Sequence, residues 1–168
     1  MREKELLNPG DKIAIIDLDA HQGNGFERVF MDDASVFIFD MYNKDIYPQD
    51  QVAKHKIAVD VPLPMGAGDD VYMNLLHEKL PPFLDTLSDA KLVFYKAGTD
   101  VLAGDSLGGL NVSKQHVIDR DVYVFEQLIQ RNLPFVMLLS GGYTKQSYQI
   151  IADSLTQLLS MCGVSKSA

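Results

Sequence analysis

Two aspartates and a histidine follow an apolar segment at alternate positions, and their types point to metal chemistry. Asp17, Asp19 and His21 come directly after the apolar residues 13–16. Successive side chains of an extended chain point to opposite sides, so these three would share one side if the strand geometry continued to its end. Carboxylate oxygens and imidazole nitrogens are ligands for divalent metal ions. The segment therefore predicts a compact group of metal-binding side chains.

Asp100 can complete a ligand set with Asp19 and His21. It follows the apolar segment that ends at Tyr95, and Asp40 closes another such segment. Two carboxylates and one imidazole suit a divalent metal ion that keeps open positions for water and substrate. Any one of these residues taken alone would more often cap a helix or bond a loop, but burying several acids together without a cation is costly. Their convergence at one sheet edge favours the metal site.

The sequence Ser-Gly-Gly-Tyr at 140–143 opens the last expected helix. Gly141 and Gly142 allow the backbone to approach a ligand closely. The hydroxyl of Tyr143 can donate to an oxyanion that develops on a metal-polarised carbonyl. A glycine turn with a packed tyrosine explains the same residues, so both interpretations stay open at this point.

The elements that must position these residues are apolar segments alternating with amphipathic ones. Strands are predicted at residues 12–19, 35–41, 56–61, 91–95 and 135–139, and helices at 26–31, 69–79, 113–131 and 144–161. Strands that are apolar on both faces and alternate with helices are typical of parallel sheets covered on both sides. The sequence predicts an α/β three-layer sandwich with a mainly parallel sheet. Ligands bind outside the carboxyl ends of such strands.

Local signals refine the predicted helices. Ser113 is a predicted N-cap, and the pair at 81–82, Pro-Pro, predicts a break or kink after the second helix. Apolar residues recur at spacings of three and four in the last two helices, which predicts a buried stripe on each and a core or near-core position for the single cysteine. The stripes are Ile118, Val122, Phe125 and Ile129 in the third helix, and Ile151, Leu155, Leu158 and Cys162 in the fourth.

Composition bounds the class of protein. The 168 residues are enough for one hydrophobic core, so a single domain spanning residues 1–168 is expected. The formal net charge of −8 argues against a nucleic-acid partner. No apolar run approaches the roughly 18 residues of a membrane span. One cysteine and the lack of a secretory signal favour a reducing, cytoplasmic location.

Several motifs in this order resemble the class IV branch of the histone deacetylases, over residues 12–159. The resemblance implies the arginase/deacetylase fold and a zinc-dependent hydrolase. Its expected substrates are acyl-lysine proteins or peptides, with acetyl or long fatty acyl groups, or small acyl-amines. The main motifs are Asp17-Leu18-Asp19-Ala20-His21-Gln22-Gly23-Asn24-Gly25, Ala97-Gly98-Thr99-Asp100, Leu107-Gly108-Gly109-Leu110 and Ser140-Gly141-Gly142-Tyr143.

The resemblance also assigns roles to single residues. Asp19, His21 and Asp100 match the zinc ligands, and Tyr143 matches the tyrosine that stabilises the transition state. Asp17 matches a buried acid that supports a catalytic histidine.

Further residues match a second cation site and the substrate pocket. Asp17 and Asp40 match positions that bind a structural potassium ion. Leu107, Gly141 and Gly142 match the walls of the acyl pocket. Zinc and potassium are therefore the expected cofactors.

The family places a pair of consecutive histidines, which transfer protons, upstream of the first of these motifs, and the 168 residues contain no such pair. The resemblance therefore covers only the C-terminal half of a catalytic domain. Positioned acid–base groups typically contribute about 10²–10⁴ in rate, so the isolated chain is expected to lose much activity. An exposed sheet edge is also expected, covered by an N-terminal half fragment or by a second copy in a homodimer.

Two other functions remain as alternatives. The chain can be a catalytically inactive deacetylase-fold domain that acts in binding or regulation. A weaker reading takes Asp17-Leu18-Asp19 after an apolar strand as the phosphotransfer motif of haloacid dehalogenases. That reading fits poorly because it leaves the later Gly-Thr-Asp and Gly-Gly-Tyr sequences without a role.

Overall fold

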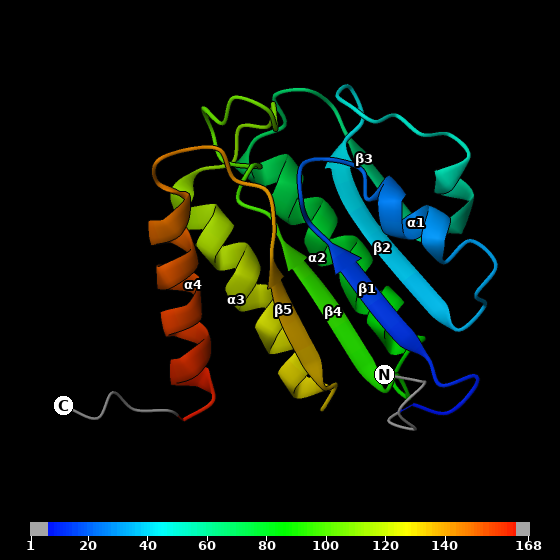
Figure 1. Cartoon of the computed structure of the whole chain (residues 1–168). Coiled ribbons are helices and arrows are strands. Elements are labelled where there is room, and N and C mark those ends of the chain that lie inside the picture. Colours follow the sequence, from blue (N-terminus) through cyan, green and yellow to red (C-terminus); the bar gives the residue numbers. More distant parts are fainter. Residues whose placement is uncertain (1–6, 164–168) are drawn as a thin grey trace.

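The computed structural model describes residues 7–163, in which five parallel strands form one sheet. The strand order is β3-β2-β1-β4-β5, so the first strand of the chain lies at the centre (Figure 1). This confirms the predicted α/β architecture. The strands are β1 (Ile13–Asp17), β2 (Val36–Asn43), β3 (Ile57–Leu63), β4 (Leu92–Ala97) and β5 (Phe135–Leu139). The helices are α1 (Asn24–Val29), the 3-10 helix η2 (Ala53–Lys56), α2 (Asp69–Asp85), α3 (Lys114–Gln130) and α4 (Ser147–Met161).

Strand register places three charged residues side by side at the carboxyl end of the sheet. Asp17 is the last residue of β1, and it pairs with Asp40 on β2 and with Lys96 on β4. Partners in a parallel ladder point to the same face of the sheet. The three side chains therefore crowd one face of the sheet, next to the turn that carries the predicted metal ligands.

Helices cover the two faces of the sheet unequally. Behind the sheet in Figure 1, α2 and α3 enclose the main core, in which Ile16, Tyr95 and Phe125 are fully buried. The front face carries the short helix α1, whose Phe26 packs over Ile15 on β1 and its neighbours on β2. Both faces of the sheet are thus covered by helices only at β1 and β2.

The front face of β5 is exposed, and that of β4 is only partly covered. Phe94 on β4 pairs in register with Val136 on β5 and lies beside Ile15 on β1, so these residues share the front face. Val136 is 40% exposed and Leu138 is 42% exposed. The prediction that all five strands are buried is therefore wrong for β5. It is also wrong for β3, where buried and exposed residues alternate.

The helix α2 continues through its two prolines, so the predicted break at 81–82 is wrong. Prolines 81 and 82 lie inside the helix, which ends only at Asp85. A proline removes a hydrogen bond to the carbonyl four residues earlier, and those carbonyls belong to His77 and Glu78, which are exposed and can be hydrated. Phe83 and Leu84, both buried, hold the last turn against the core.

The predictions for α3 and α4 are partly confirmed. Ser113 caps α3, and its hydroxyl accepts a hydrogen bond from the backbone N–H of His116 at 3.4 Å. In α4 the buried residues are Ser147, Ile150 and Ser154, whereas Leu155 and Cys162 are exposed. The predicted stripe is therefore wrong for Leu155 and Cys162, whereas Ile151 and Leu158 are partly buried and Leu158 packs against the main core. The helix turns a face with Ile150 and two serines toward the core, so the predicted stripe is only half covered.

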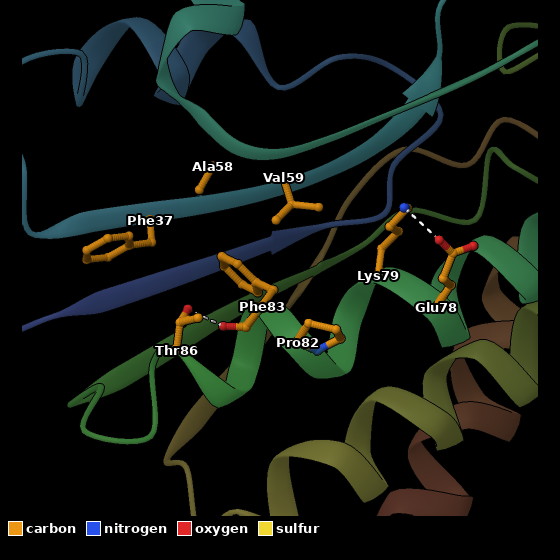
Figure 2. Close-up of a pocket in the computed structure, with 8 residues that line it drawn as sticks. All are labelled: Phe37, Ala58, Val59, Glu78, Lys79, Pro82, Phe83 and Thr86. Carbon is orange, nitrogen blue, oxygen red and sulfur yellow. Dashed lines mark hydrogen bonds and ion pairs between the residues drawn. The ribbon is translucent and has the colours of Figure 1, made fainter.

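Figure 2 shows a mainly apolar groove between α2 and the strands β2 and β3. Phe37, Val59 and Phe83 line it, and an ion pair of 2.7 Å joins Lys79 and Glu78 beside it. Its strand residues come from the beginnings of β2 and β3. The groove therefore lies at the end of the sheet opposite the polar clusters. Among residues 7–163, none of the helices combines the length and apolar character needed to cross a membrane.

Replacing a residue of the central strand tests the unequal cover of the two faces. Ile16→Ala should lower the free energy of unfolding by about 2–4 kcal/mol, because the lost methyl groups leave a cavity in the main core. Val136→Ala, on the bare front face, should cost less than about 1 kcal/mol. Urea unfolding followed by circular dichroism measures both. Similar losses for the two variants would contradict the exposure of the β5 front face.

Candidate functional site

Two turns, rather than a continued strand, bring the residues after β1 together. The strand ends at Asp17, whose Oδ1 accepts a hydrogen bond from the backbone N–H of Asp19 at 3.0 Å. Oδ1 of Asp19 accepts one from the backbone N–H of His21 at 2.9 Å. Aspartate side chains commonly bond the backbone two residues further on, which curls the chain. The extended geometry assumed from the sequence therefore stops two residues early.

The structure brings Asp19, His21 and Asp100 into one cluster, with one ligand atom from each lying within 4.8 Å of the others. Nδ1 of His21 lies 3.1 Å from Oδ1 of Asp19 and 3.0 Å from Oδ2 of Asp100. The other oxygen of Asp100 accepts a hydrogen bond from the backbone N–H of Ala20 at 2.8 Å. One imidazole nitrogen thus faces two carboxylates that come from neighbouring strands.

This donor set fits a divalent cation. Asp19 and Asp100 are buried, and the side chain of His21 is 24% exposed, which leaves one side open. Burial and the neighbouring Asp19 charge raise the pKa of Asp100 to about 6. A cation between the two carboxylates would relieve that repulsion. Imidazole nitrogen and carboxylate oxygen are both ligands that zinc accepts.

The loop after β5 holds the carboxylate of Asp19 in place. Oδ2 of Asp19 accepts hydrogen bonds from the hydroxyl of Ser140 at 2.6 Å and from the backbone N–H of Gly141 at 2.9 Å. A side chain at position 141 would collide with the carboxylate of Asp100. Gly142, the second residue predicted to line the pocket, packs against Thr99 instead of the metal ligands. Glycine at 141 is therefore needed for the close approach of this loop to the cluster.

Tyr143 and Leu107 lie on the exposed rim of the cluster. The ring of Tyr143 meets the ring of His21 edge to face, with 6.4 Å between centroids. Tyr143 is 54% exposed and Leu107 is 52% exposed. Burial and the charges of Asp100 and Asp19 raise the pKa of the Tyr143 hydroxyl, so it is protonated at neutral pH and able to donate.

Asp105 joins these two rim residues. Its Oδ2 accepts a hydrogen bond from the backbone N–H of Tyr143 at 2.8 Å. Its Oδ1 accepts hydrogen bonds from the backbone N–H of Leu107 at 2.9 Å and from the backbone N–H of Gly108 at 3.1 Å. Asp105 is not among the site residues predicted from the sequence. Its effect is to tie the loop after β4 to the loop after β5.

A second acidic cluster lies beneath the first. Asp17, Asp40 and Glu27 are fully buried, and one oxygen of Asp40 and one of Glu27 have no hydrogen-bond partner among the described residues. Burial raises the pKa of Asp17 to about 7, against the lowering effect of Lys96, and burial and the Asp17 charge raise the pKa of Asp40 well above its usual range. Such unpartnered carboxylate oxygens fit a hard cation. Glu27, in α1, was missed because no motif marks it.

Two cations complete the site, the fully buried Arg120 and the partly buried Lys96, and sequence reasoning missed both. Nη1 of Arg120, on α3, donates to the carbonyl of Leu18 at 3.1 Å and to the carbonyl of Gly98 at 2.7 Å, which joins the two loops that carry the metal ligands. Nζ of Lys96 lies 3.1 Å from Oδ2 of Asp17. Lys96 lies within the observed β4 but one residue beyond the strand predicted at 91–95, and no motif marks it.

Solved structures share this arrangement of strands and helices. An acetylpolyamine aminohydrolase from Burkholderia pseudomallei aligns over 89% of this chain and 45% of its own, with a TM-score of 0.74 and 18% identity. The HDA15 HD domain aligns over 94% of this chain and 46% of its own, with a TM-score of 0.70 and 24% identity. The fold is thus that of deacetylases and related aminohydrolases.

Sequence comparison places the chain more narrowly. Residues 3–159 match the histone deacetylase domain, and the chain belongs to that family. It is 46% identical over 147 residues to histone deacetylase 2 of Arabidopsis thaliana, which covers 88% of this chain and 38% of that protein. It is 30% identical over 148 residues to histone deacetylase HDAC1 of Drosophila melanogaster, covering 83% of this chain and 27% of that protein. The chain spans less than half the length of these relatives.

Replacing Asp105 tests its role in joining the two loops. Asp105→Ala should destabilise the chain by about 1–3 kcal/mol, because backbone N–H groups lose a shared acceptor. Amide hydrogen exchange should accelerate first at Tyr143, Leu107 and Gly108. Asp153→Ala, which removes only a surface ion pair with Lys114, is the matched control and should change stability by less than about 0.5 kcal/mol. Unchanged exchange at Tyr143 would contradict the role of Asp105.

Proposed function

We propose that the chain carries the zinc-binding part of a lysine deacylase of the class IV branch. The observation that carries the proposal is the cluster of Asp19, His21 and Asp100, whose ligand atoms lie within 4.8 Å of one another at the carboxyl edge of the sheet. Family membership supports a deacetylase type of hydrolysis. The motif resemblance supports the class IV assignment and the single domain over residues 1–168.

The residues of the chain divide the chemistry between them. A zinc ion held by this ligand set would polarise the acyl carbonyl and acidify a water molecule. The hydroxyl of Tyr143, on the rim next to His21, donates a hydrogen bond to the carbonyl oxygen as negative charge develops there. Ser140 and Gly141 keep the carboxylate of Asp19 oriented throughout, because both donate to the same oxygen.

The substrate is an acylated amine, which is an acyl-lysine in a protein or peptide, or a small acyl-amine. Support comes from the names of similar proteins, which include histone deacetylases and an acetylpolyamine aminohydrolase. Leu107 and Met65 expose apolar side chains on adjoining loops, and Met65 packs against Gly109. An apolar rim of this kind suits an acyl chain, acetyl or longer.

A potassium ion near Asp17 and Asp40 is the second cofactor of this proposal, and Glu27 joins them as a further oxygen donor. The unpartnered oxygens of Asp40 and Glu27 support it, since three buried carboxylates together are costly without a cation. A bound monovalent ion would also fix the turn that begins at Asp17.

Residues 1–168 contain no two consecutive histidines, so in this proposal the proton-transfer pair lies outside these residues. The exposed front of β5 and its position at the edge of the sheet support a covering partner, because β5 has apolar residues on both faces and no charged residue to discourage strand pairing. The covering partner in this proposal is an N-terminal half fragment or a second copy of this chain, and only the former can supply the histidine pair. A cytoplasmic location remains a prediction.

A second candidate function is a non-catalytic domain that keeps the fold for binding or regulation. The specific observation in its favour is the lack of a histidine pair. The two candidates differ in turnover, so measuring zinc content and peptide hydrolysis separately distinguishes metal binding from catalysis.

Zinc binding tests the ligand set directly. The purified chain, after removal of metal with a chelator and dialysis against zinc, should hold about one zinc ion per chain by elemental analysis. Asp100→Ala should lose that ion, because a ligand is missing and its buried partners no longer converge. Asp60→Ala, on β3 away from the cluster, should keep it. Equal zinc content in the chain and in Asp100→Ala would contradict the site.

Hydrolysis of acylated peptides tests catalysis. The zinc-loaded chain should hydrolyse acetyl-lysine or myristoyl-lysine peptides, slowly because its general base is missing. Tyr143→Phe should lower kcat by about 10²-fold or more while zinc content stays unchanged, since it removes an oxyanion donor. Tyr148→Phe, on the exposed surface of α4, is the control. Absence of turnover at full zinc loading would favour the binding domain.

A further inference from the structure

Lys96 is the one lysine whose ammonium group lies among the candidate metal ligands in the described part of the chain. It belongs to β4 and stands in register with Asp17 on β1, on the front face of the sheet. Nζ lies 3.1 Å from Oδ2 of Asp17 and 3.6 Å from Oδ2 of Asp19. Nζ also lies 5.8 Å from the ring centroid of Phe26 on α1. The lysine thus places a full positive charge beside the predicted zinc site.

The positive charge of Lys96 offsets repulsion between the two buried carboxylates that it contacts. The side chains of Asp17 and Asp19 are 0% and 5% exposed, and two carboxylates this deeply buried repel each other. Lys96 touches both, so it offsets part of that repulsion. The long alkyl stem of a lysine can pack along apolar surface while its ammonium reaches a polar group, and the ring of Phe26 lies near enough for a cation–π contact.

Lys96 also acts on a carboxylate that is already oriented. Oδ2 of Asp19 accepts from Ser140 and Gly141 and faces Lys96, whereas Oδ1 faces His21. The ammonium therefore adds to a set of donors that fixes the same oxygen. A cation bound between Asp19 and His21 would lie on the other side of that carboxylate, still close enough to be repelled by Lys96.

We propose that Lys96 is an internal counter-charge that holds the Asp17 and Asp19 carboxylates ready in the metal-free chain and weakens the binding of zinc. The proposal rests on the proposed zinc site and concerns how tightly that site binds. Lys96 is a positioning residue, because it acts through Asp19 and not on the substrate. Its two effects oppose each other, since orientation favours zinc and charge disfavours it. Repulsion wins because Ser140 and Gly141 alone already orient Asp19.

Two variants separate charge from hydrogen bonding. Lys96→Gln keeps a donor of similar reach toward Asp17 and removes the charge, whereas Lys96→Arg keeps the charge. Zinc affinity is measured by competition with a chromophoric chelator, on the full chain with zinc as the only added metal. Lys96→Gln should bind zinc roughly tenfold or more tightly than the unaltered chain. Lys96→Arg should bind with an affinity within about threefold of that of the unaltered chain.

Thermal unfolding in chelator and in zinc gives a second readout that a merely structural role would not move. Without metal, Lys96→Gln should melt below the unaltered chain, because Asp17 and Asp19 lose their counter-charge. With zinc, its melting temperature should rise by more than that of the unaltered chain, since tighter binding stabilises the folded state more. If Lys96→Gln folds only with zinc, the same conclusion follows.

The outcomes that overturn the proposal differ from those that overturn the zinc site. If zinc binding depends on Asp100 but Lys96→Gln binds zinc equally or more weakly, the counter-charge proposal is wrong and the site stands. If zinc binding does not depend on Asp100 in the unaltered chain or in Lys96→Gln, both are wrong. Zinc binding that appears only in Lys96→Gln, and disappears in the double variant with Asp100→Ala, would support both.

Discussion

Repulsion among buried carboxylates is the constraint on which the carboxyl end of the sheet and its loops depend. Parallel register brings Asp17 and Asp40 side by side at the ends of neighbouring strands, and the turn after β1 adds Asp19 next to Asp100. Carboxylates are rarely tolerated in this density without cations or many donors. The chain supplies backbone N–H groups, the Ser140 hydroxyl and one ammonium group, and it leaves open positions that metal ions fit. The loops around the site are shaped by these donors.

The metal ligands of the site could be predicted from the sequence. The contacts that depend on strand pairing and helix docking could not. Asp19 and His21 are separated by one residue, and Asp100 follows from the rule that ligands gather at the carboxyl ends of parallel strands. Lys96 and Glu27 meet the acids only because of the pairing of β1 with β4 and the docking of α1, which no spacing along the chain reveals. Their contacts join residues that lie far apart in sequence.

The fold was predictable from the hydrophobic pattern, and the wrong predictions about it share one cause. Apolar segments alternating with amphipathic ones indicate a parallel sheet with helices, which the structure has. The errors concern burial. The apolar stripe of α4 and the front of β5 were expected to be covered, because apolar residues usually are, yet Leu155 and Val136 are exposed here. Hydrophobic pattern shows which surfaces suit burial, and it does not identify the polypeptide that buries them.

The central position of β1 has a consequence for synthesis of the chain. β1 can pair with β2 soon after both are made, but its other neighbour, β4, begins only at Leu92. At about 5–20 residues per second, translation needs several seconds to supply it. During that interval one edge of β1 has no partner among the described residues. A chaperone or the ribosome surface would have its longest opportunity to bind nascent chain at this edge.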